Sequence, residues 1–496
     1  MDLSYAFLNV FNPSSLLFIL LGVVIGNIFG CIPGLNTPIA LALELPFTMV
    51  MGRVPSICLI MGTYMGCVSG GLVPATLLRI PGTAASIATT FEGYPMTLKG
   101  YGTYALTVGA FASFYGGIFS SFMLLLLSPL LAKFAVGFGP WEYFGATILA
   151  LTLVSIIIQG RMIKGFIALG LGLLVKTVGT SPVDGVVQRF SLGNMYLENG
   201  FNLIAVLIGA FALPEVISSI TKLKEHIPVP EIDKRWFHYL PGKDFFRLHG
   251  IMLRSSIIGT VVGILPGLGG GPAGMMAYAI AKKTSTRSEE FGTGCDEGIA
   301  ASESANNATT GGALIPLLAL SVPGDTATAV MIGILSIQGI PIGPNLTFSE
   351  PILFKTILLV VFIANFFMYL YQGTTLRFMS KVVRVPRMYL LPLIIIFCIT
   401  GIFCINSNIY DVYFTLGFII LGYILDKNDY PMAPFIMGVV LGPTVEENLR
   451  RAIGYYGNFV NCFVQRSVGT LFVIIAIILP LSIGFIGMKK NILLKK

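Results

Sequence analysis

The sequence predicts an all-α polytopic membrane protein with about 10–12 transmembrane segments, some of them broken or re-entrant. Only 11% of its 496 residues are charged, whereas roughly 25% are charged in soluble globular proteins. Apolar residues make up 55% of the chain, and the mean hydropathy is +0.85. Because so few charged side chains cannot cover a water-facing surface, this composition excludes a soluble domain, a disordered scaffold and a disulfide-rich secreted domain.

Long charge-free intervals mark the candidate membrane segments. A helix needs about 20 mostly apolar residues to cross the hydrocarbon layer. Some intervals have this length, whereas others are short or contain proline and glycine, which suits half-helices and re-entrant hairpins. The first interval lacks the basic start of a signal peptide, so we expect it to be the first membrane segment. The intervals are residues 3–43, 54–78, 101–132, 143–160, 199–214, 255–281, 304–324, 326–349, 356–376, 388–410, 430–445 and 467–488.

The charge distribution predicts an orientation in the membrane. The net charge is +8, and basic residues of membrane proteins collect in loops that stay in the cytoplasm. The polar loop 221–249 carries six of them, and the chain ends in Lys495 and Lys496. We therefore expect this loop and the C-terminus to be cytoplasmic, and the basic charge gives no reason to expect nucleic acid. The six are Lys222, Lys224, Lys234, Arg235, Lys243 and Arg247.

Short motifs occur twice in the same order, which predicts an internal repeat. We expect a first membrane repeat at 1–220 and a second at 250–496, joined by the polar loop 221–249 and inverted relative to each other. The copies of the three motifs lie 233, 242 and 246 residues apart. The pairs are Pro33-Gly34-Leu35 with Pro266-Gly267-Leu268, the set Gly70, Pro74, Pro81 and Gly82 with Gly312, Pro316, Pro323 and Gly324, and Gly93-Tyr94-Pro95 with Gly339-Ile340-Pro341.

Matching Pro/Gly breaks in two repeats are the pattern that points to the substrate site of a carrier. A broken helix leaves backbone groups unpaired, and lipid cannot satisfy them, so such breaks line cavities. The N-terminus of a half-helix carries a partial positive charge and free N–H groups, which suit a carboxylate. Exposed oxygens there could hold Na⁺. We expect two such termini to meet near the middle of the bilayer, with one repeat moving against the other.

The second copy is the more polar one, because residues 303–312 read ESANNATTGG. Adjacent asparagines and hydroxyls favour substrate or ion coordination, and hydrogen bonding between helices is the alternative. Glu303 is the first candidate for coupling to H⁺ or Na⁺, unless it faces the mouth of the site. Arg79 is a candidate counter-ion for an anionic substrate, unless it is an interfacial arginine that extends toward water. Weaker candidates, each at the end of a segment, are Glu44, Glu92 and Asp325.

The residues predicted to bind substrate or ion follow from these motifs. No catalytic residue and no structural metal site is predicted, and no cofactor beyond a coupling Na⁺ or H⁺. The predicted residues are Pro33, Gly34, Asn36, Gly70, Gly71, Arg79, Pro81, Gly82, Pro266, Gly267, Glu303, Ser304, Asn306, Asn307, Thr309, Gly311, Gly312, Pro323 and Gly324.

An enzymatic function is not expected. The sequence has no HExxH, GxSG or GxGD motif, and its three histidines all lie in one loop, residues 226–249. The cysteines form no CxxC or Cys/His cluster, so they read as small buried residues. The run Gly269–Gly274 matches GxGxxG, but no βαβ pattern surrounds it, so a dinucleotide site is not indicated.

At these motifs the sequence resembles the large membrane subunit of the tripartite tricarboxylate transporters. The segments that carry the resemblance cover most of the chain in the family's order. The Asn-Asn and Glu-Glu-Asn segments are the specific ones, whereas the Pro-Gly pieces alone are not. They are Pro33-Gly34-Leu35-Asn36, Gly70-Gly71 with Pro81-Gly82, Glu303-Ser304-Ala305-Asn306-Asn307 with Gly311-Gly312 and Pro323-Gly324, and residues 442–451, which read GPTVEENLRR.

The resemblance implies a carrier of the bacterial inner membrane that works with a small membrane subunit of about four spans and a periplasmic solute-binding protein. The binding protein captures a carboxylate, and the membrane pair imports it with an ion gradient rather than ATP. This chain departs from the family pattern at Arg79 and at Glu44, which interrupts an apolar stretch, so a di- or monocarboxylate is as plausible a substrate as citrate. A stand-alone carrier or channel for a small organic anion is the alternative function.

The charges at 446–451 form opposite pairs four residues apart, which indicates a helix. We interpret this helix as an interfacial or partner-docking surface, and a plain solvated face is the alternative. The pairs are Glu446 with Arg450 and Glu447 with Arg451.

Overall fold

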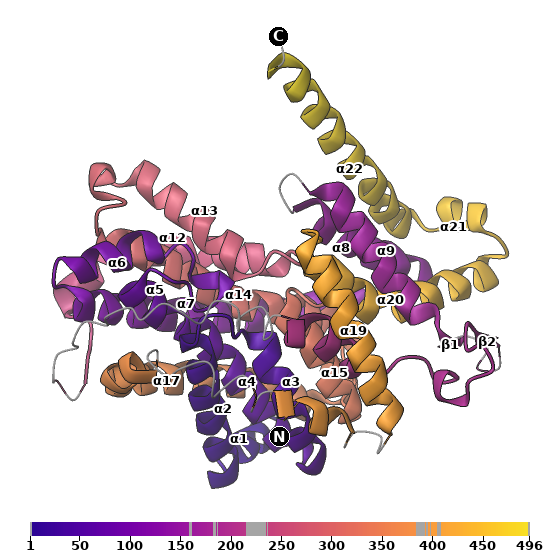
Figure 1. The fold of residues 1–496 in the computed structure, drawn as a ribbon, viewed down its shortest axis with the longest axis horizontal. Coiled ribbons are helices and arrows are strands. Elements are labelled where there is room, and N and C mark those ends of the chain that lie inside the picture. Colours follow the sequence, from indigo (N-terminus) through magenta and orange to yellow (C-terminus); the bar gives the residue numbers. More distant parts are fainter. Residues whose placement is uncertain are drawn as a thin grey trace.

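The computed structural model describes residues 2–157, 161–181, 185, 187–214, 235, 237–382, 392, 395–396, 398–403 and 408–494. Within these residues the chain is almost entirely helical, as Figure 1 shows. The two strands described, β1 (Gly179–Thr180) and β2 (Gln188–Arg189), pair antiparallel with Gly179 opposite Arg189. The predicted all-α fold class is confirmed. Most of the polar loop 221–249 and the last two lysines lie outside the described residues.

The N-terminal part forms a compact group of helices that ends in one long helix. Its elements are α1 (Asp2–Val10), α2 (Pro13–Cys31), α3 (Thr37–Val50), α4 (Arg53–Gly70), α5 (Leu72–Leu78), the 3₁₀ helix η1 (Ala84–Ser86), α6 (Thr90–Leu98) and α7 (Gly102–Ala135). The next elements are α8 (Pro140–Ile157), α9 (Met162–Thr177), the two strands, the 3₁₀ helix η2 (Met195–Leu197), α10 (Leu203–Leu207) and the π-helix η3 (Ile208–Ala212).

The C-terminal part has a similar order of elements and then adds a peripheral group. Its elements are α12 (Gly242–Ile264), α13 (Gly270–Thr284), the 3₁₀ helix η4 (Ser288–Glu290), α14 (Asp296–Leu320), α15 (Thr326–Ile337), α16 (Pro344–Ser349) and α17 (Pro351–Val382). They are followed by α19 (Ile409–Lys427), α20 (Met432–Tyr456), α21 (Phe459–Gln465) and α22 (Ser467–Leu494). Helix α22 leaves the body of the fold at the top of Figure 1.

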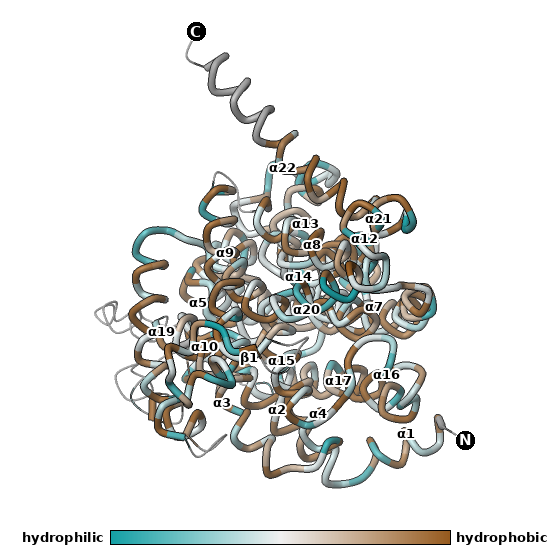
Figure 2. The backbone as a smooth tube through the Cα atoms, turned by 90° about the vertical axis from the view of Figure 1, so that its right-hand side faces the viewer, coloured by the Kyte–Doolittle hydropathy of each residue, from teal (hydrophilic) through white to brown (hydrophobic). Residues whose placement is uncertain are grey.

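Six elements are long and apolar enough to cross a membrane, namely α2, α4 with α5, α7, α12, α17 and α19. Helix α21 and the first part of α22 would form a seventh span, bent by 111°. Helices α3, α8 and α15 are apolar but shorter, as expected of half-spans. Hydrophobic residues colour most helices brown in Figure 2, and the 18-residue apolar stretch within the span made by α4 and α5 is entirely buried inside the protein. The chain is therefore a multi-pass membrane protein.

Glycines allow α2 and α4 to pack with their backbones in contact. A Cβ atom at Gly26 would lie 2.3 Å from the carbonyl oxygen of Thr63, and one at Gly30 would lie 2.2 Å from that of Cys67. From the opposite helix, a Cβ at Gly70 would lie 2.6 Å from the oxygen of Asn27. Any larger residue would force these helices apart, so the glycine spacing sets their distance.

The same contacts recur between α12 and α14. A Cβ at Gly259 would lie 2.1 Å from the oxygen of Ala305, one at Gly263 would lie 2.7 Å from that of Thr309, and one at Gly312 would lie 2.6 Å from that of Thr260. Each of these three glycines, and each residue that it faces, lies 233 or 242 residues after the equivalent residue of the first hairpin, which are the separations of the first two motifs. Both hairpins are thus built to one backbone plan.

The Pro-Gly breaks also match. Gly34 (φ 92°) and Gly267 (φ 81°) both turn the chain with a positive φ that favours glycine. The helix before each second break ends in a left-handed residue, Arg79 in one copy and Ser321 in the other. The third predicted pair differs, because Gly93 lies inside α6 whereas Gly339 follows the end of α15.

The structural counterpart of Gly339 (φ 63°) is Gly100 (φ 85°) rather than Gly93. In both turns the N–H of the next residue bonds a carbonyl five residues back, from Tyr101 to Met96 and from Ile340 to Leu335. These bonds identify the same type of helix end. The sequence match failed here because proline at 95 is tolerated inside α6.

Each copy is completed by elements of the other. The long helix α7 packs along α14, and the corresponding helix α17 packs along α4. The short elements cross in the same way, since α13 contacts η1 and α15 contacts α3. The centre of the molecule is therefore formed by both parts of the chain together.

Candidate functional site

The start of α14 is held by Glu92 of α6, which is completely buried. Its carboxylate accepts hydrogen bonds from the backbone N–H groups of Gly292 (2.5 Å), Gly294 (2.8 Å) and Cys295 (2.8 Å), and from the hydroxyl of Tyr278 (2.6 Å). Four donors on one carboxylate fix the turn that leads into α14. Glu92 therefore has an architectural contact, which its place at a segment end in the sequence did not suggest.

An ion-pair cluster lies at the same end of α14. Asp296 bonds Arg287 (2.9 Å) and also pairs with Arg247 of α12. Arg287 further bonds Glu290 (2.5 Å) in the connection between α13 and α14. This guanidinium, which donates hydrogen bonds to Glu290, holds the pKa of that exposed carboxyl below its usual value. The cluster ties α12 and the start of α14 to the connection that follows α13, outside the apolar core.

Glu303 lies on the buried middle of α14 and is enclosed by the other part of the chain. The hydroxyl of Thr89, between η1 and α6, donates to its Oε1, and the hydroxyl of Ser113 on α7 donates to its Oε2 at 3.0 Å. Its relative exposure is 0%. In this structure Glu303 does not face the mouth of a site, and both carboxylate oxygens have partners.

The two asparagines connect α14 to elements of the first copy. Asn306 Nδ2 donates to the carbonyl oxygen of Ala85 in η1 (3.2 Å). Asn307 Nδ2 donates to Asn306 Oδ1 (2.5 Å), and its Oδ1 accepts from the hydroxyl of Ser69 on α4 (2.6 Å). The hydroxyl of Thr309 bonds the Asn306 carbonyl oxygen (2.5 Å). We call Ser69, Ala85, Glu303, Asn306, Asn307 and Thr309 the polar centre.

The N-terminus of α13 closes over the polar centre. A Cβ atom at Gly270 would lie 2.8 Å from the Cβ of Ala85, 3.3 Å from the hydroxyl oxygen of Thr309 and 3.4 Å from the Cβ of Asn306. The residue before it, Gly269, has no side chain to cap the first N–H groups of this helix. An uncapped helix N-terminus beside amide and hydroxyl donors has the chemistry of a carboxylate site.

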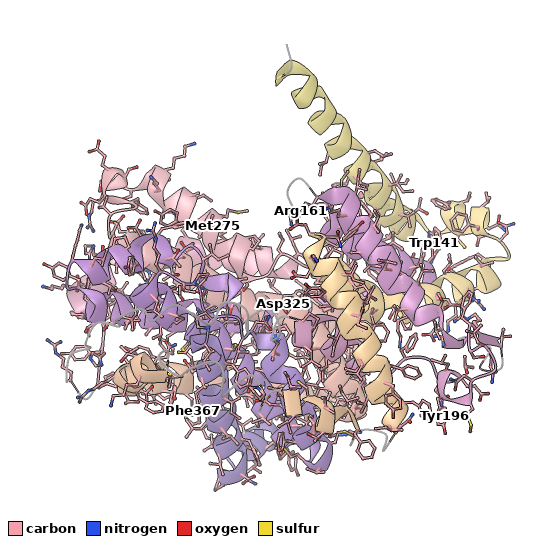
Figure 3. The ribbon with its side chains drawn as sticks, viewed as in Figure 1. Trp141, Arg161, Tyr196, Met275, Asp325 and Phe367 are labelled. Atoms are coloured by element: carbon pink, nitrogen blue, oxygen red, sulfur yellow. The ribbon has the colours of Figure 1, made fainter. Side chains whose placement is uncertain are left out.

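The two other helix starts in this region are capped by side chains. Asn36 Oδ1 accepts from the N–H of Ile39 (3.2 Å) at the start of α3. Asp325, near the centre of the molecule in Figure 3, accepts from the N–H of Thr328 (2.8 Å) at the start of α15 and from the hydroxyl of Tyr64 (2.7 Å). A side chain that accepts from the first N–H groups of a helix leaves fewer of them for an anionic ligand, and the negative charge of Asp325 also repels one, so α13 is the best placed of the three to bind an anion.

The predicted site residues divide into groups. Glu303, Asn306, Asn307 and Thr309 meet in the polar centre. Ser304 and Gly311 lie on the side of α14 that packs against α7, where Cβ atoms on Gly116 and Gly311 would meet the oxygens of Ser304 (2.0 Å) and Ser120 (2.6 Å).

The predicted residues of the breaks lie in tight backbone contacts. A Cβ at Gly82 would lie 2.1 Å from the oxygen of Gly30 and 2.8 Å from the Cα of Gly71, and Gly267 donates to the oxygen of Gly324 (2.7 Å). Pro33, Gly34, Gly70, Pro81, Pro266, Gly312 and Pro323 belong to the same turns and hairpins. Arg79, by contrast, has an exposed side chain, so in this structure it does not share the buried surroundings of the polar centre.

The sequence reasoning missed the first-copy partners of the polar centre. Ser69 and Ser113 are single small hydroxyl residues inside apolar stretches, Thr89 is the first of two adjacent threonines and lies in a connection, and the oxygen of Ala85 belongs to the backbone. Such residues carry no pattern of their own. Their proximity to α14 appears only once η1, α4 and α7 are packed around that helix.

Comparison with known proteins agrees with the architecture. Residues 16–437 match the model of the tripartite tricarboxylate transporter TctA family. An uncharacterized 52.8 kDa protein in the TAR-I ttuC' 3' region of Agrobacterium vitis is 34% identical over 91% of this chain and 89% of its own length. A second protein of that organism, in the TAR-II ttuC' 3' region, is 38% identical over 39% of this chain and 81% of its own length.

An uncharacterized protein of Methanocaldococcus jannaschii is 22% identical over 52% of this chain and 59% of its own length. No solved structure matches the chain. The extent of the family match, together with the first relative, settles the assignment. The chain belongs to the tripartite tricarboxylate transporter TctA family.

Proposed function

We propose that the chain imports a tri- or dicarboxylate across the bacterial inner membrane as a secondary transporter driven by a gradient of Na⁺ or H⁺. It would act as the large membrane subunit, with a small membrane subunit of about four spans and a periplasmic solute-binding protein. Its C-terminus would be cytoplasmic. Family membership supports the role as a large transporter subunit, and the site chemistry supports the class of substrate.

The uncapped start of α13 against Asn306 and Thr309 carries this proposal. In the closed arrangement the Asn306 amide is occupied by the oxygen of Ala85, and Gly270 covers Thr309. Separation of α13 and η1 would release the amide and the first N–H groups of α13. These donors could then bind a carboxylate, whose charge the helix terminus stabilises. Occlusion between elements of both copies fits a carrier that opens alternately to each side.

The proposal predicts that Asn306→Ala abolishes carboxylate uptake while the protein stays in the membrane. We expect uptake of radiolabelled citrate or succinate to fall by at least about tenfold, because about 1.4 kcal/mol of lost binding gives that factor. The measurement uses cells that lack their own carboxylate uptake and express the chain with its small subunit and its binding protein. Western blots of the membrane fraction report the amount of protein.

Asn428→Ala is the matched control, because Asn428 is exposed and its side chain bonds only a backbone oxygen on its own helix, that of Ile424 (2.8 Å). Normal uptake by Asn306→Ala would remove this residue from the site. Omission of the binding protein separates the tripartite mechanism from a stand-alone carrier, since the tripartite system should lose uptake at low substrate concentration and a stand-alone carrier should not.

A further inference from the structure

Glu44 lies on α3 in the first copy and is almost completely buried, with a relative exposure of 3%. Its Oε1 is within hydrogen-bonding distance of the Thr63 hydroxyl on α4. Its Oε2 is buried and has no hydrogen-bond partner in the part of the chain that the structure describes. This contrasts with Glu303, whose two oxygens both accept hydrogen bonds. A carboxylate is costly to bury when its charge is not compensated.

The described elements that pack against α3 bring no cation to Glu44. Helices α2, α4 and α15 and the π-helix η3 pack against α3, and residue Gly401 approaches Pro46 of α3. Among these described elements the sole basic residue is Arg53 at the exposed start of α4, which is paired with Glu350 (3.2 Å). The remaining titratable groups there are Cys31, Cys58, Tyr64, Cys67, the capping Asp325 and Cys398. Cys67 is the one that interacts electrostatically with Glu44.

The hydrogen bonds of Thr63 indicate which form of Glu44 fits. The Thr63 hydroxyl has one proton but two acceptors in reach, the carboxyl of Glu44 and the carbonyl oxygen of Gly22 (3.1 Å). If the carboxyl is neutral, its O–H donates to Thr63 and Thr63 donates to Gly22, so every polar hydrogen is used. If the carboxyl is ionised, Thr63 can serve only one acceptor, and a buried negative charge remains unpaired.

From this geometry we propose that Glu44 is the proton-binding group that couples transport to the H⁺ gradient. The proposal rests on the proposed transport function and selects H⁺ rather than Na⁺. The carboxylate takes up one proton when α3 is open to the outside and forms the neutral acid. Only the neutral acid lets α3 pack against α4, and the same proton leaves to the cytoplasm when α3 opens there. No covalent bond to the substrate forms.

The link between protonation and conformation is local. Helix α3 begins at the first Pro-Gly break, and α15, whose capping Asp325 bonds Tyr64 on α4, packs against it. Closure of α3 is therefore favoured by the proton and by the contacts of both copies at once. A ligand that binds only one of two conformations shifts their balance by its differential affinity, and here the proton is that ligand.

The first test is spectroscopic and needs no substrate. The infrared difference spectrum between the full-length wild type and Glu44→Gln, each in lipid at neutral pH, should show the loss of a carbonyl stretch of a neutral carboxylic acid. Loss of ionised carboxylate bands instead would overturn the proposal. Glu289→Gln is the matched control, because Glu289 is exposed in the connection between α13 and α14 and its replacement should remove carboxylate bands.

The second test measures coupling in membrane vesicles that contain the complete transporter. Under an inward proton gradient, accumulation of radiolabelled citrate or succinate should fall by about tenfold or more in Glu44→Gln, whereas exchange of labelled for unlabelled substrate should stay within about twofold. Glu44→Met, which also lacks a titratable group, should behave alike and guards against an effect specific to the amide. Glu289→Gln should accumulate substrate as the wild type does.

The outcomes distinguish a failure of the role of Glu44 from a failure of the proposed transport function. Unchanged proton-driven accumulation in Glu44→Gln, or a wild type driven by Na⁺ regardless of the proton gradient, would overturn the role of Glu44. If Glu44→Gln loses both exchange and accumulation, Glu44 serves substrate binding rather than coupling, and this result also overturns the proposed role in coupling. Absence of carboxylate transport in the wild type would contradict the proposed function, while the infrared result would still decide whether Glu44 binds a proton.

Discussion

The hairpins α2–α4 and α12–α14 share their backbone contacts but not their chemistry. Where α14 has Glu303, Asn306 and Thr309, the corresponding positions of α4 have Met61, Tyr64 and Cys67. The helix between the two members of each hairpin also differs. Asn36 caps α3 in the first copy, whereas Gly269 leaves the start of α13 uncapped in the second. The glycines that set the helix distance are retained in both. Close packing is therefore the common requirement, whereas a carboxyl and an amide side chain stand at these three positions in the second copy alone.

The comparison predicts that the shared contacts are equally indispensable. Gly26→Leu and Gly259→Leu should both prevent folding. The Cβ atom alone would lie 2.3 Å from a carbonyl oxygen at position 26 and 2.1 Å from one at position 259. We expect a cost of at least about 3 kcal/mol, the upper range of overpacking. Yield of monodisperse protein in detergent measures it. Gly250→Leu is the control, since a Cβ there has open space. Normal yield from one of the two glycine variants would show that the copies differ in packing as well.

An intermediate loss of stability is expected at Glu92, whose contacts with the start of α14 have no counterpart in the other copy. Glu92→Gln places an amide among the backbone donors of Gly292, Gly294 and Cys295, so at least one N–H loses its acceptor. A buried unsatisfied group costs about 1–3 kcal/mol. We expect a lower temperature of thermal unfolding and easier proteolysis between α13 and α14. An unchanged unfolding temperature would mean that the ion pairs of Asp296 hold this turn without Glu92.

The smallest effect concerns the exposed part of the same turn and depends on pH. Arg287 lowers the pKa of Glu290 in the folded protein, so this carboxyl adds stability above its unfolded pKa, and the gain is lost as the pH falls through the folded value. Glu290→Gln should therefore lower the unfolding temperature slightly at neutral pH and not at strongly acidic pH. High salt should reduce the difference, because the pair is exposed. A difference that persists in acid would assign the effect to another interaction.

The sequence predicted the elements with strong local signals and missed those that depend on packing. Composition was enough for the fold class, and the Pro-Gly breaks and the polar run of α14 were recognised from residue types alone. The sequence pairs the turn at Gly339 with Gly93 instead of Gly100, because the same Gly-x-Pro pattern occurs inside a helix in one copy and after a helix end in the other. Glu44 and Glu92 were both ranked as segment ends, since burial and partners cannot be read from a lone acidic residue.

The deep burial of the polar α14 has a consequence for biogenesis. A helix with adjacent asparagines and a glutamate would enter lipid alone at a considerable cost, because each polar side chain makes insertion by the translocon less favourable. Its main neighbours α7 and α12 precede it in the chain. They are therefore synthesised first, so the nascent α14 can pack against these helices rather than insert into lipid alone. The apolar hairpin thus precedes the polar one in the chain, and this order lets the polar helix be inserted after the helices that bury its side chains.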